Sequence, residues 1–560
     1  MKVRHRLYAA VLLVLAATAA AQTAVAPAPA AAPRFEIWFA ASAHAQPITG
    51  RVYVIITRRS SPEPRLQVGS WTQETPFFGA DVSQLKPGEP AVIDANTLGY
   101  PLASLKDIPA GDYYVQGLMN VYTEFHRADG HTIWAHMDQW EGQQFNESPG
   151  NLYSQTQQVH LDPAGYNVKL QLTEVIPPVK VPPDTKWVKR IKFQSALLSK
   201  FWGRPIYLGA TVLLPKDYDQ HPTVRYPVIY EQDHFSLRAP LQFRDEQEGR
   251  GNGRWGEQRE RLYRDWTGPN FPRVIAVTFQ HPTPYFDDSY AVNSANNGPY
   301  GDAIMRELIP YIEERFRIIR EPWARVLTGG STGGWESLAL QVFHPEFFGG
   351  TFTFYPDPID FRRYQLIDIY SDENAFYAPG FEWVPRERPL MRTAEGQVVV
   401  TMKQMSQLEE VLGARGRSGQ QIEAWEAVYG PVGPDGYPKP LWNKLTGKID
   451  RDVAHYMRDH GYDLRAYLEK NWQKIGPQLT GKIHIYCGDM DNFYLNLAVY
   501  QMEEFLESTK SPAAKATFEY GRPVKGHGWS PYTLSELVTV IADYIAQQAP
   551  AGADVKRWKY

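Results

Sequence analysis

The chain has 560 residues, of which 43% are hydrophobic, and its formal net charge is -4. This length and hydrophobic content suffice for large buried cores and exceed what one ordinary domain needs. The small net charge gives no argument for binding nucleic acid or an anionic membrane surface.

The N-terminus has the pattern of a secretory signal peptide over residues 1–21. Basic residues among the first six precede an apolar run from Leu7 to Ala19, and cleavage is expected after Ala21. The run is short for a membrane span. Residues 22–33 are rich in alanine and proline and predict a disordered leader. We therefore expect a soluble mature protein that is periplasmic or secreted.

Residues 34–175 carry strand signals and no convincing long helix. Apolar and polar residues alternate at 35–39 and 52–56, and turn residues separate such runs. Short strands at this spacing predict an antiparallel β-sandwich domain. The proline-rich stretch 176–185 predicts a stiff, extended linker.

Residues 186–548 follow a different pattern, in which strands alternate with helices. Two antiparallel strands are expected at 191–198 and 206–214. Continuous apolar runs are typical of buried parallel strands, and they occur at 226–230, 273–277, 351–355, 482–487 and 516–520. A helix is expected at 534–547. This alternation predicts an α/β domain with a mostly parallel, doubly wound sheet.

About 120 residues separate two of the predicted strands, far more than a crossover connection needs. Parts of this insertion, 356–481, are expected to be helical: 403–412, 420–429 and 464–472. Because it leaves the C-terminal edge of the sheet, we interpret it as a cap that shapes a substrate pocket. The alternative is an insertion that adds stability far from any site.

Ser331 lies in a Gly-x-Ser-x-Gly turn between a predicted strand and a predicted helix. An amphipathic helix is expected upstream at 302–317. This setting is that of a nucleophile elbow, which predicts a strained serine backbone. Gly329 and Gly333 lack the Cβ atoms that would collide in so sharp a turn. The serine hydroxyl would then stand at a helix N-terminus, ready for nucleophilic attack.

A serine nucleophile needs a base, and the base needs an orienting carboxylate. In this architecture the order along the chain is serine, acid, histidine. The histidines that follow Ser331 are His344, His455, His460, His484 and His527. We favour His527 as the base, because it follows the last predicted strand in a loop where glycines flank it.

The acid is expected in the loop after the penultimate strand, which offers two aspartates. We favour Asp491, and Asp489 is the alternative; the unused one would cap a helix or brace the loop. The oxyanion hole needs two backbone N–H groups. We expect them from Thr332 and from Phe235 in the loop after strand 226–230.

Neither a metal nor an organic cofactor is expected. Asp287 and Asp288 suggest a calcium site, but without further ligands in register we interpret them as part of a solvated loop. The single cysteine, Cys487, excludes an intramolecular disulfide and is expected to pack inside a strand.

Four pieces of the sequence, 307–312, 325–334, 488–494 and His527, resemble the putative-esterase family of α/β-hydrolases. The likeness spans about 186–547 and implies the α/β-hydrolase fold, with Ser331, Asp491 and His527 as the triad. It also implies backbone oxyanion donors at Thr332 and Phe235. The chain departs from the family at Thr332, where methionine is frequent, at His234, where glycine is usual, and in its larger insertion.

The residues and the resemblance together predict a secreted serine carboxylic-ester hydrolase. Its substrate would be a small-molecule or glycan-linked ester, such as a siderophore ester or an acylated polysaccharide. An acyltransferase or peptidase with the same triad, or a non-catalytic binding protein, are the alternatives. A β-sandwich ahead of the hydrolase domain is similar in architecture to the enterochelin esterase arrangement. We expect this N-terminal domain to be structural. Trp134 and Trp140 would also permit sugar binding, and cap docking or dimerisation stay open.

Overall fold

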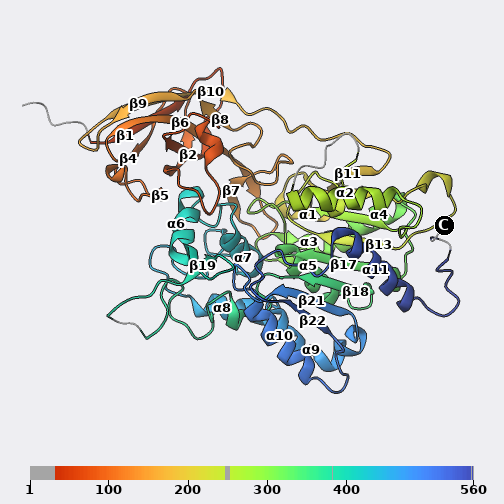
Figure 1. Ribbon diagram of the computed structural model, residues 1–560. Helices are drawn as coiled ribbons and strands as arrows, with labels where there is room; N and C mark the ends of the chain where they lie inside the picture. The colour runs from red at the N-terminus through yellow and green to blue at the C-terminus, as the bar shows by residue number, and fades with distance from the viewer. Residues whose placement is uncertain (1–31, 246–252, 381–382, 557, 559–560) are drawn as a thin grey trace, which may run out of the picture.

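The computed structural model describes residues 32–245, 253–380, 383–556 and 558 (Figure 1). The predicted signal peptide and nearly all of the predicted leader lie outside the described residues. Figure 1 shows a β-rich domain at the upper left, an α/β domain on the right, and helices of the insertion between and below them.

An eight-stranded sheet forms the centre of the α/β domain, in the order β11-β12-β14-β13-β17-β18-β21-β22. Its strands are β11 (Val188–Ser195), β12 (Ile206–Leu213), β13 (Val228–Gln232), β14 (Ile275–Gln280), β17 (Arg325–Gly330), β18 (Gly350–Phe354), β21 (Ile483–Gly488) and β22 (Thr517–Gly521). The pairs β11–β12 and β12–β14 are antiparallel, and the other neighbouring pairs are parallel. Every strand predicted for this domain is present, and the order is that of an α/β-hydrolase sheet.

Successive side chains of a strand point to opposite faces of the sheet, and in this sheet apolar side chains point to both faces. Helices therefore cover both faces. On one face, α2 (Gly253–Thr267) and α11 (Leu534–Gln548) share a core with β13 and β17. The other face carries α5 (Thr332–Phe343), α10 (Asn496–Ser508) and a helical stretch that begins at Tyr300. This stretch consists of α3 (Tyr300–Ala303), a single π-helical segment η5 (Ile304–Leu308) and α4 (Ile309–Arg315), where one helix was predicted.

The N-terminal domain is all-β. Its main strands are β1 (Arg34–Phe39), β2 (Ile48–Thr57), β3 (Phe77–Leu85), β6 (Gly111–His126) and β10 (Asn167–Val175), with shorter strands β4 (Ala91–Asp94), β5 (Gly99–Tyr100), β7 (Thr132–His136), β8 (Leu152–Ser154) and β9 (Gln157–Leu161). Hydrogen bonds join them in one ten-stranded sheet, rather than in two separate sheets. Side chains of β1 and β10 meet those of β2 and β3 in one core, so this sheet bends around its own interior.

The insertion divides into two parts with different positions. Near its start come a small hairpin, β19 (Pro389–Arg392) and β20 (Val398–Thr401), and the helices α6 (Met402–Leu412) and α7 (Gln421–Tyr429). These helices face the N-terminal domain and the C-terminal edge of the large sheet. Later come α8 (Arg451–Asp459) and α9 (Leu464–Leu479), and α9 packs on α5 like an ordinary crossover helix. Only the first part therefore has the position expected of a cap.

The N-terminal domain docks on this cap. Arg51 donates hydrogen bonds from Nε to the carbonyl of Val411 (2.9 Å) and from a terminal nitrogen to that of Glu410 (2.8 Å). The cap residue Arg417 donates to Asp81 of β3 (2.5 Å). These contacts show that the N-terminal domain packs directly on the cap.

Two tryptophans considered as sugar-binding residues are not freely exposed. Trp140 is 6% exposed and packs edge-on against Phe235 of the α/β domain, at 5.2 Å between ring centroids. Trp134 is half-buried, and its carbonyl accepts a hydrogen bond from Arg417 of the cap. Trp140 therefore belongs to a domain contact and is not free to bind sugar, whereas the half-buried Trp134 contacts the cap through its main chain.

Cys487 is fully buried in β21, as expected. Within the described part of the chain, no helix is both long enough and apolar enough to cross a bilayer.

Candidate active site

Ser331 stands at the turn between β17 and α5, with backbone angles φ 59° and ψ -121°. A non-glycine residue in this region of φ and ψ is strained. The main chain holds it there, because the Ser331 N–H donates to the carbonyl of Phe354 (3.1 Å) and the Ser331 carbonyl accepts from Asp357 N–H (3.1 Å). The predicted nucleophile elbow is confirmed in its geometry.

The two flanking glycines are required by close backbone approach. A Cβ atom on Gly329 would lie 2.2 Å from the carbonyl oxygen of Gly333, and one on Gly333 would lie 2.0 Å from that of Gln232. Real Cβ atoms do not approach oxygen so closely. The elbow therefore packs directly on the end of β13, which brings the loop after β13 beside the serine.

His527 and Asp491 are joined at the same sheet edge. Nδ1 of His527 lies 2.8 Å from Oδ2 of Asp491, and the His527 N–H donates to Oδ1 of Asn492 (2.7 Å). The other Asp491 oxygen accepts from the N–H groups of Phe493 (2.9 Å) and Leu495 (3.3 Å). The carboxyl group is fully buried, so its orientation and that of the ring are well defined.

The alternative candidates occupy other positions. Oδ1 of Asp489 accepts from the N–H of Lys525 (2.8 Å), so this aspartate braces the histidine loop, as anticipated for the unused acid. His344 ends α5 and His484 lies in β21, as expected. His455 lies in α8, and His460 follows that helix.

The hydroxyl of Ser331 points to a carboxylate that was not predicted. Its Oγ donates to Oδ1 of Asp357, at a long 3.4 Å, and no hydrogen bond between Ser331 and His527 occurs among the described residues. Oδ2 of Asp357 accepts from four side chains: Tyr290 (2.7 Å), Gln421 (3.0 Å), Thr332 (3.1 Å) and Trp425 (3.3 Å). Burial raises the pKa of Asp357, while the hydrogen bonds from Tyr290 and Thr332 and the charge of His234 oppose that rise.

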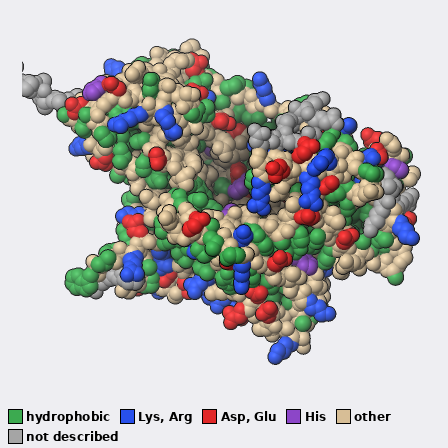
Figure 2. Space-filling model, viewed as in Figure 1, with side chains coloured by type: hydrophobic (Ala, Val, Ile, Leu, Met, Phe, Trp, Pro, Cys, Tyr) green, Lys and Arg blue, Asp and Glu red, His purple; other side chains and the backbone are tan. Residues whose placement is uncertain are grey.

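A cavity of about 360 Å³ opens over Ser331, and three parts of the chain line it. The α/β domain supplies His234, Phe286, Asp287, Ser331, Asp357, Gln365, Phe493 and Leu495; the cap supplies Gly419, Gln420, Gln421 and Trp425; the N-terminal domain supplies Gly69, Trp71 and Gln144. Figure 2 shows a hollow on this face of the molecule, where the β-rich domain meets the α/β domain. Aromatic rings and carboxamides predominate in the lining, which suits an aromatic or polyhydroxylated group.

In the loop after β13, His234 and not Phe235 lines the cavity. Phe235 turns its ring towards Trp140 and Gly142 of the N-terminal domain. The N–H of His234 donates to Oδ1 of Asp233 (2.9 Å), so it is already engaged. The oxyanion donors Thr332 and Phe235 stay predictions: the Thr332 N–H lies at the start of α5, where helix geometry leaves it without a main-chain acceptor.

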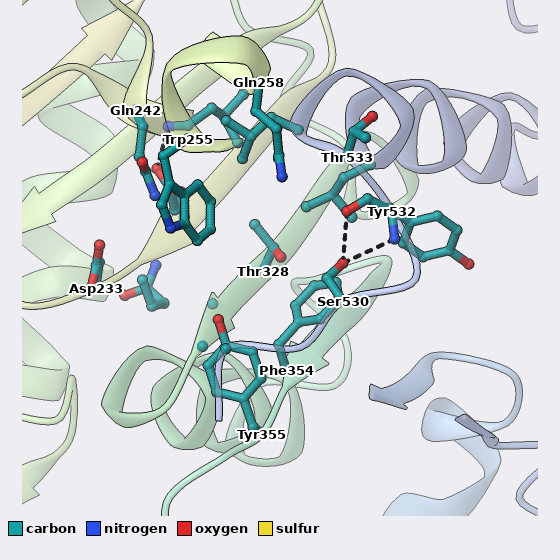
Figure 3. A pocket seen from close by; sticks show the side chains of 18 of the residues that line it. Asp233, Gln242, Trp255, Gln258, Thr328, Phe354, Tyr355, Ser530, Tyr532 and Thr533 are labelled. Atoms are coloured by element: carbon teal, nitrogen blue, oxygen red, sulfur yellow. Dashed lines mark hydrogen bonds between the residues drawn. The ribbon is translucent and has the colours of Figure 1, made fainter. Parts of the chain in front are cut away.

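A second pocket, of about 210 Å³, is lined by Tyr355, by the two glycines that precede Ser331 and by the glycine that follows His527. Figure 3 shows Trp255 of α2, Tyr355 and Asp233 around it, with the hydroxyl of Ser530 hydrogen-bonded to Tyr532. Tyr355 lines this pocket, and its ring packs edge-on against the imidazole of His527 (4.6 Å between centroids).

The interpretation of Asp287 and Asp288 as a solvated loop is wrong for Asp288. Its side chain is 1% exposed and lies 3.5 Å from Nδ1 of His234, which is also 3.1 Å from Asp287. The tertiary fold thus buries Asp288, although in the sequence Asp287 and Asp288 look like residues of an ordinary polar turn.

Sequence reasoning missed Asp357 although a signal for it existed. Asp357 follows β18 closely, and functional side chains of α/β sheets gather where parallel strands end. Gln421 and Trp425 carried no comparable signal, because their approach to the serine depends on how the insertion folds back over the sheet.

The sheet order and the strained elbow serine define the class of the protein as an α/β-hydrolase. Residues 207–421 match the putative esterase family, which agrees with the resemblance seen in the sequence and supports an ester hydrolase. The matched segment contains Ser331 and ends before Asp491 and His527. No curated protein matches the sequence significantly.

Solved structures of hydrolases resemble the chain at low identity. One is a ferulic acid esterase, with 15% identity and a TM-score of 0.37; the match covers 65% of this chain and 99% of that one. Another is an S-formylglutathione hydrolase from Agrobacterium tumefaciens, with 13% identity and a TM-score of 0.34; the match covers 66% of this chain and 98% of that one. A third is FphF, a fluorophosphonate-binding serine hydrolase from Staphylococcus aureus, with 13% identity and a TM-score of 0.30; the match covers 64% of this chain and 97% of that one. Scores this low carry no argument about function, so the fold is assigned from the sheet order of the chain itself.

Proposed function

We propose that this protein is a secreted carboxylic-ester hydrolase in which Ser331, His527 and Asp491 act as the catalytic triad. The observation that carries the proposal is the strained elbow serine at the sheet edge where Asp491 orients His527 (2.8 Å). Secretion rests on the signal-peptide pattern of residues 1–21.

In the proposed reaction, Ser331 attacks the ester carbonyl while His527 takes the hydroxyl proton. Asp491 holds Nδ1 of His527 and stabilises the imidazolium that forms. His527 then protonates the leaving alcohol, and water hydrolyses the acyl-enzyme by the same route. The serine hydroxyl, which faces Asp357 in the absence of substrate, must first turn towards His527; catalytic hydrogen bonds often tighten only when substrate is bound.

The aromatic and carboxamide lining of the cavity supports an ester with a ring or several hydroxyl groups on one side. Siderophore esters and acylated polysaccharides both contain such groups, and we propose them as the substrate classes to examine first. A panel of aryl, acetyl and hydroxycinnamoyl esters would distinguish them by kcat/KM.

Replacing the nucleophile tests the function directly. Ser331→Ala is expected to lower kcat on a p-nitrophenyl ester by about 10⁴- to 10⁶-fold, because it removes the attacking oxygen. A fluorophosphonate probe should label the unaltered protein and leave the variant unlabelled. Ser508→Ala, an exposed serine at the end of α10, is the matched control. Unchanged turnover or labelling of the Ser331→Ala variant would refute the assignment.

A further inference from the structure

Three carboxylates and two histidines form a cluster next to the elbow. Glu336 lies on α5, five residues after Ser331, and the other members lie in loops: His234, His281, Asp287 and Asp288. The possible ligand atoms of His234, Asp287 and Asp288 lie within 4.8 Å of one another, as do those of His281, Asp288 and Glu336. Asp288 therefore joins the two groups.

Two of these carboxylates are buried and have side-chain oxygens that accept no hydrogen bond from the described residues. Glu336 is 0% exposed, and neither of its side-chain oxygens has a hydrogen-bond partner. Asp288 is 1% exposed; one of its oxygens accepts from the N–H of Tyr290 (2.9 Å), and Oδ2 has no hydrogen bond. Burial of an ionised carboxylate is strongly unfavourable unless a proton or a cation neutralises it.

The histidines cannot supply enough positive charge. Nδ1 of His281 accepts from the N–H of Ser289 (3.0 Å), so the neutral ring carries its proton on Nε2, which is 3.9 Å from Glu336. That distance is too long for a hydrogen bond, and a protonated Nε2 cannot bind a metal. Within the described ranges, neither lysine nor arginine is ion-paired with any carboxylate of the cluster. At most one imidazolium, that of His234, faces three acids.

We propose that the cluster binds a divalent cation through Asp288 and Glu336, with Asp287 and Nδ1 of His234 completing the ligand set. Carboxylates together with an imidazole suit Mn²⁺ or Zn²⁺. His281 is not a ligand in this arrangement; its Nε2 lies 3.9 Å from Glu336. The bound ion would tie the loop after β13 to α5, and so hold the neighbourhood of the nucleophile together.

The proposal is independent of esterase activity and is tested by metal binding. The full-length mature protein, freed of metal with EDTA, is titrated with MnCl₂ and with ZnCl₂ by calorimetry, and its Tm is measured with and without each ion. We expect one ion bound per chain and a Tm rise of about 3 °C or more, because the ion binds only the folded state.

Four variants make the result specific. Glu336→Gln and Asp288→Asn should each weaken binding by at least about tenfold and abolish the Tm rise. Glu231→Gln, the same substitution at a carboxylate outside the cluster, should bind as the unaltered protein does. Ser331→Ala should also bind normally, so a failed esterase assignment would leave this proposal standing.

Two results would overturn the proposal. The first is that the unaltered protein binds neither ion, and that the Glu336→Gln variant is at least as stable as the unaltered protein. This would mean that Asp288 and Glu336 share a proton, because the side-chain amide of glutamine resembles a protonated glutamate and can donate to Asp288 in the same way. The second is ion binding that neither Glu336→Gln nor Asp288→Asn weakens, which would place the ion elsewhere.

Discussion

At the scale of single residues, the orientation of the Ser331 hydroxyl proton depends on Asp357. Asp357 Oδ1 accepts it in the structure, while Oδ2 of the same carboxylate is saturated by four donors. Asp357 is therefore rigid, and the serine side chain is the part that can rotate. Its long 3.4 Å bond is weak, so turning towards His527 costs little.

A second acidic residue at the sheet edge allows a test of pH dependence. Burial, followed by the charge of Asp233, raises the pKa of Glu231 to about 7. The folded protein thus holds this proton more tightly than the unfolded chain does, so the contribution of Glu231 to the free energy of unfolding falls as the pH rises from about 4.5 to about 7.

We expect Glu231→Gln to be more stable than the unaltered protein by about 1–3 kcal/mol at pH 8, and nearly equal to it at pH 4.5. Leu241 N–H and the Thr278 hydroxyl both donate to one oxygen of Glu231 (2.7 and 2.9 Å), which the glutamine oxygen can replace. Urea unfolding at the two pH values measures the difference. A stability difference that does not change with pH would contradict the expectation.

At the scale of elements, the loop between η1 (Pro64–Gln67) and β3 reaches across to the active site. Trp71 in this loop donates from Nε1 to Gln420 of the cap (2.8 Å), and its ring packs edge-on against Phe493 (5.5 Å between centroids). Phe493 in turn packs against His527 (4.9 Å). This loop of the N-terminal domain is thus part of the cavity wall, and the ring of Phe493 lies between Trp71 and the proposed base His527.

Trp71→Ala should raise KM for an aromatic ester by about tenfold, because an aromatic contact contributes about 0.5–1.5 kcal/mol. Trp71→Phe keeps a ring without the indole N–H and should change KM by less than about threefold. Steady-state kinetics on a bulky and a small ester provide the measurement. Equal KM values for the alanine variant and the unaltered protein would show that substrate does not contact this wall.

At the scale of the whole molecule, the cap joins the N-terminal domain to the hydrolase domain. One apolar core contains Tyr53 and Phe77 of the N-terminal domain, Leu408 and Trp425 of the cap, and Trp335 of α5. A continuous core of this kind couples the stability of all three parts. We therefore expect the described parts of the chain to unfold together rather than domain by domain.

Asp81 tests this coupling, because it bridges two buried arginines. It accepts from Arg51 (2.7 Å) and from Arg417 of the cap (2.5 Å), whose side chains are 6% and 5% exposed. Asp81→Asn leaves both cations poorly paired and should lower the free energy of unfolding by about 2–3 kcal/mol, discounted for the partial exposure of Asp81.

The matched control for this substitution is Asp112→Asn, which removes an exposed pair with His160 and should cost less than about 0.5 kcal/mol. Denaturant unfolding followed by both fluorescence and circular dichroism measures the two variants. Equal stabilities of the two variants, or separate transitions seen by the two probes, would argue against a single coupled structure.

Local patterns in the sequence determined the strands, the elbow and the position of Cys487, because each depends on near neighbours: the period of apolar residues, glycines beside Ser331, turn residues between strands. The pairing of Asp491 with His527 was also within reach, since parallel strands end at one edge. What the tertiary structure decided were contacts between segments far apart in sequence: Asp357 beside the serine, Trp71 and Gln421 in the cavity wall, and Glu336 against Asp288. Such contacts depend on how the insertion and the N-terminal domain pack on the sheet, and no period or spacing within one segment encodes that packing.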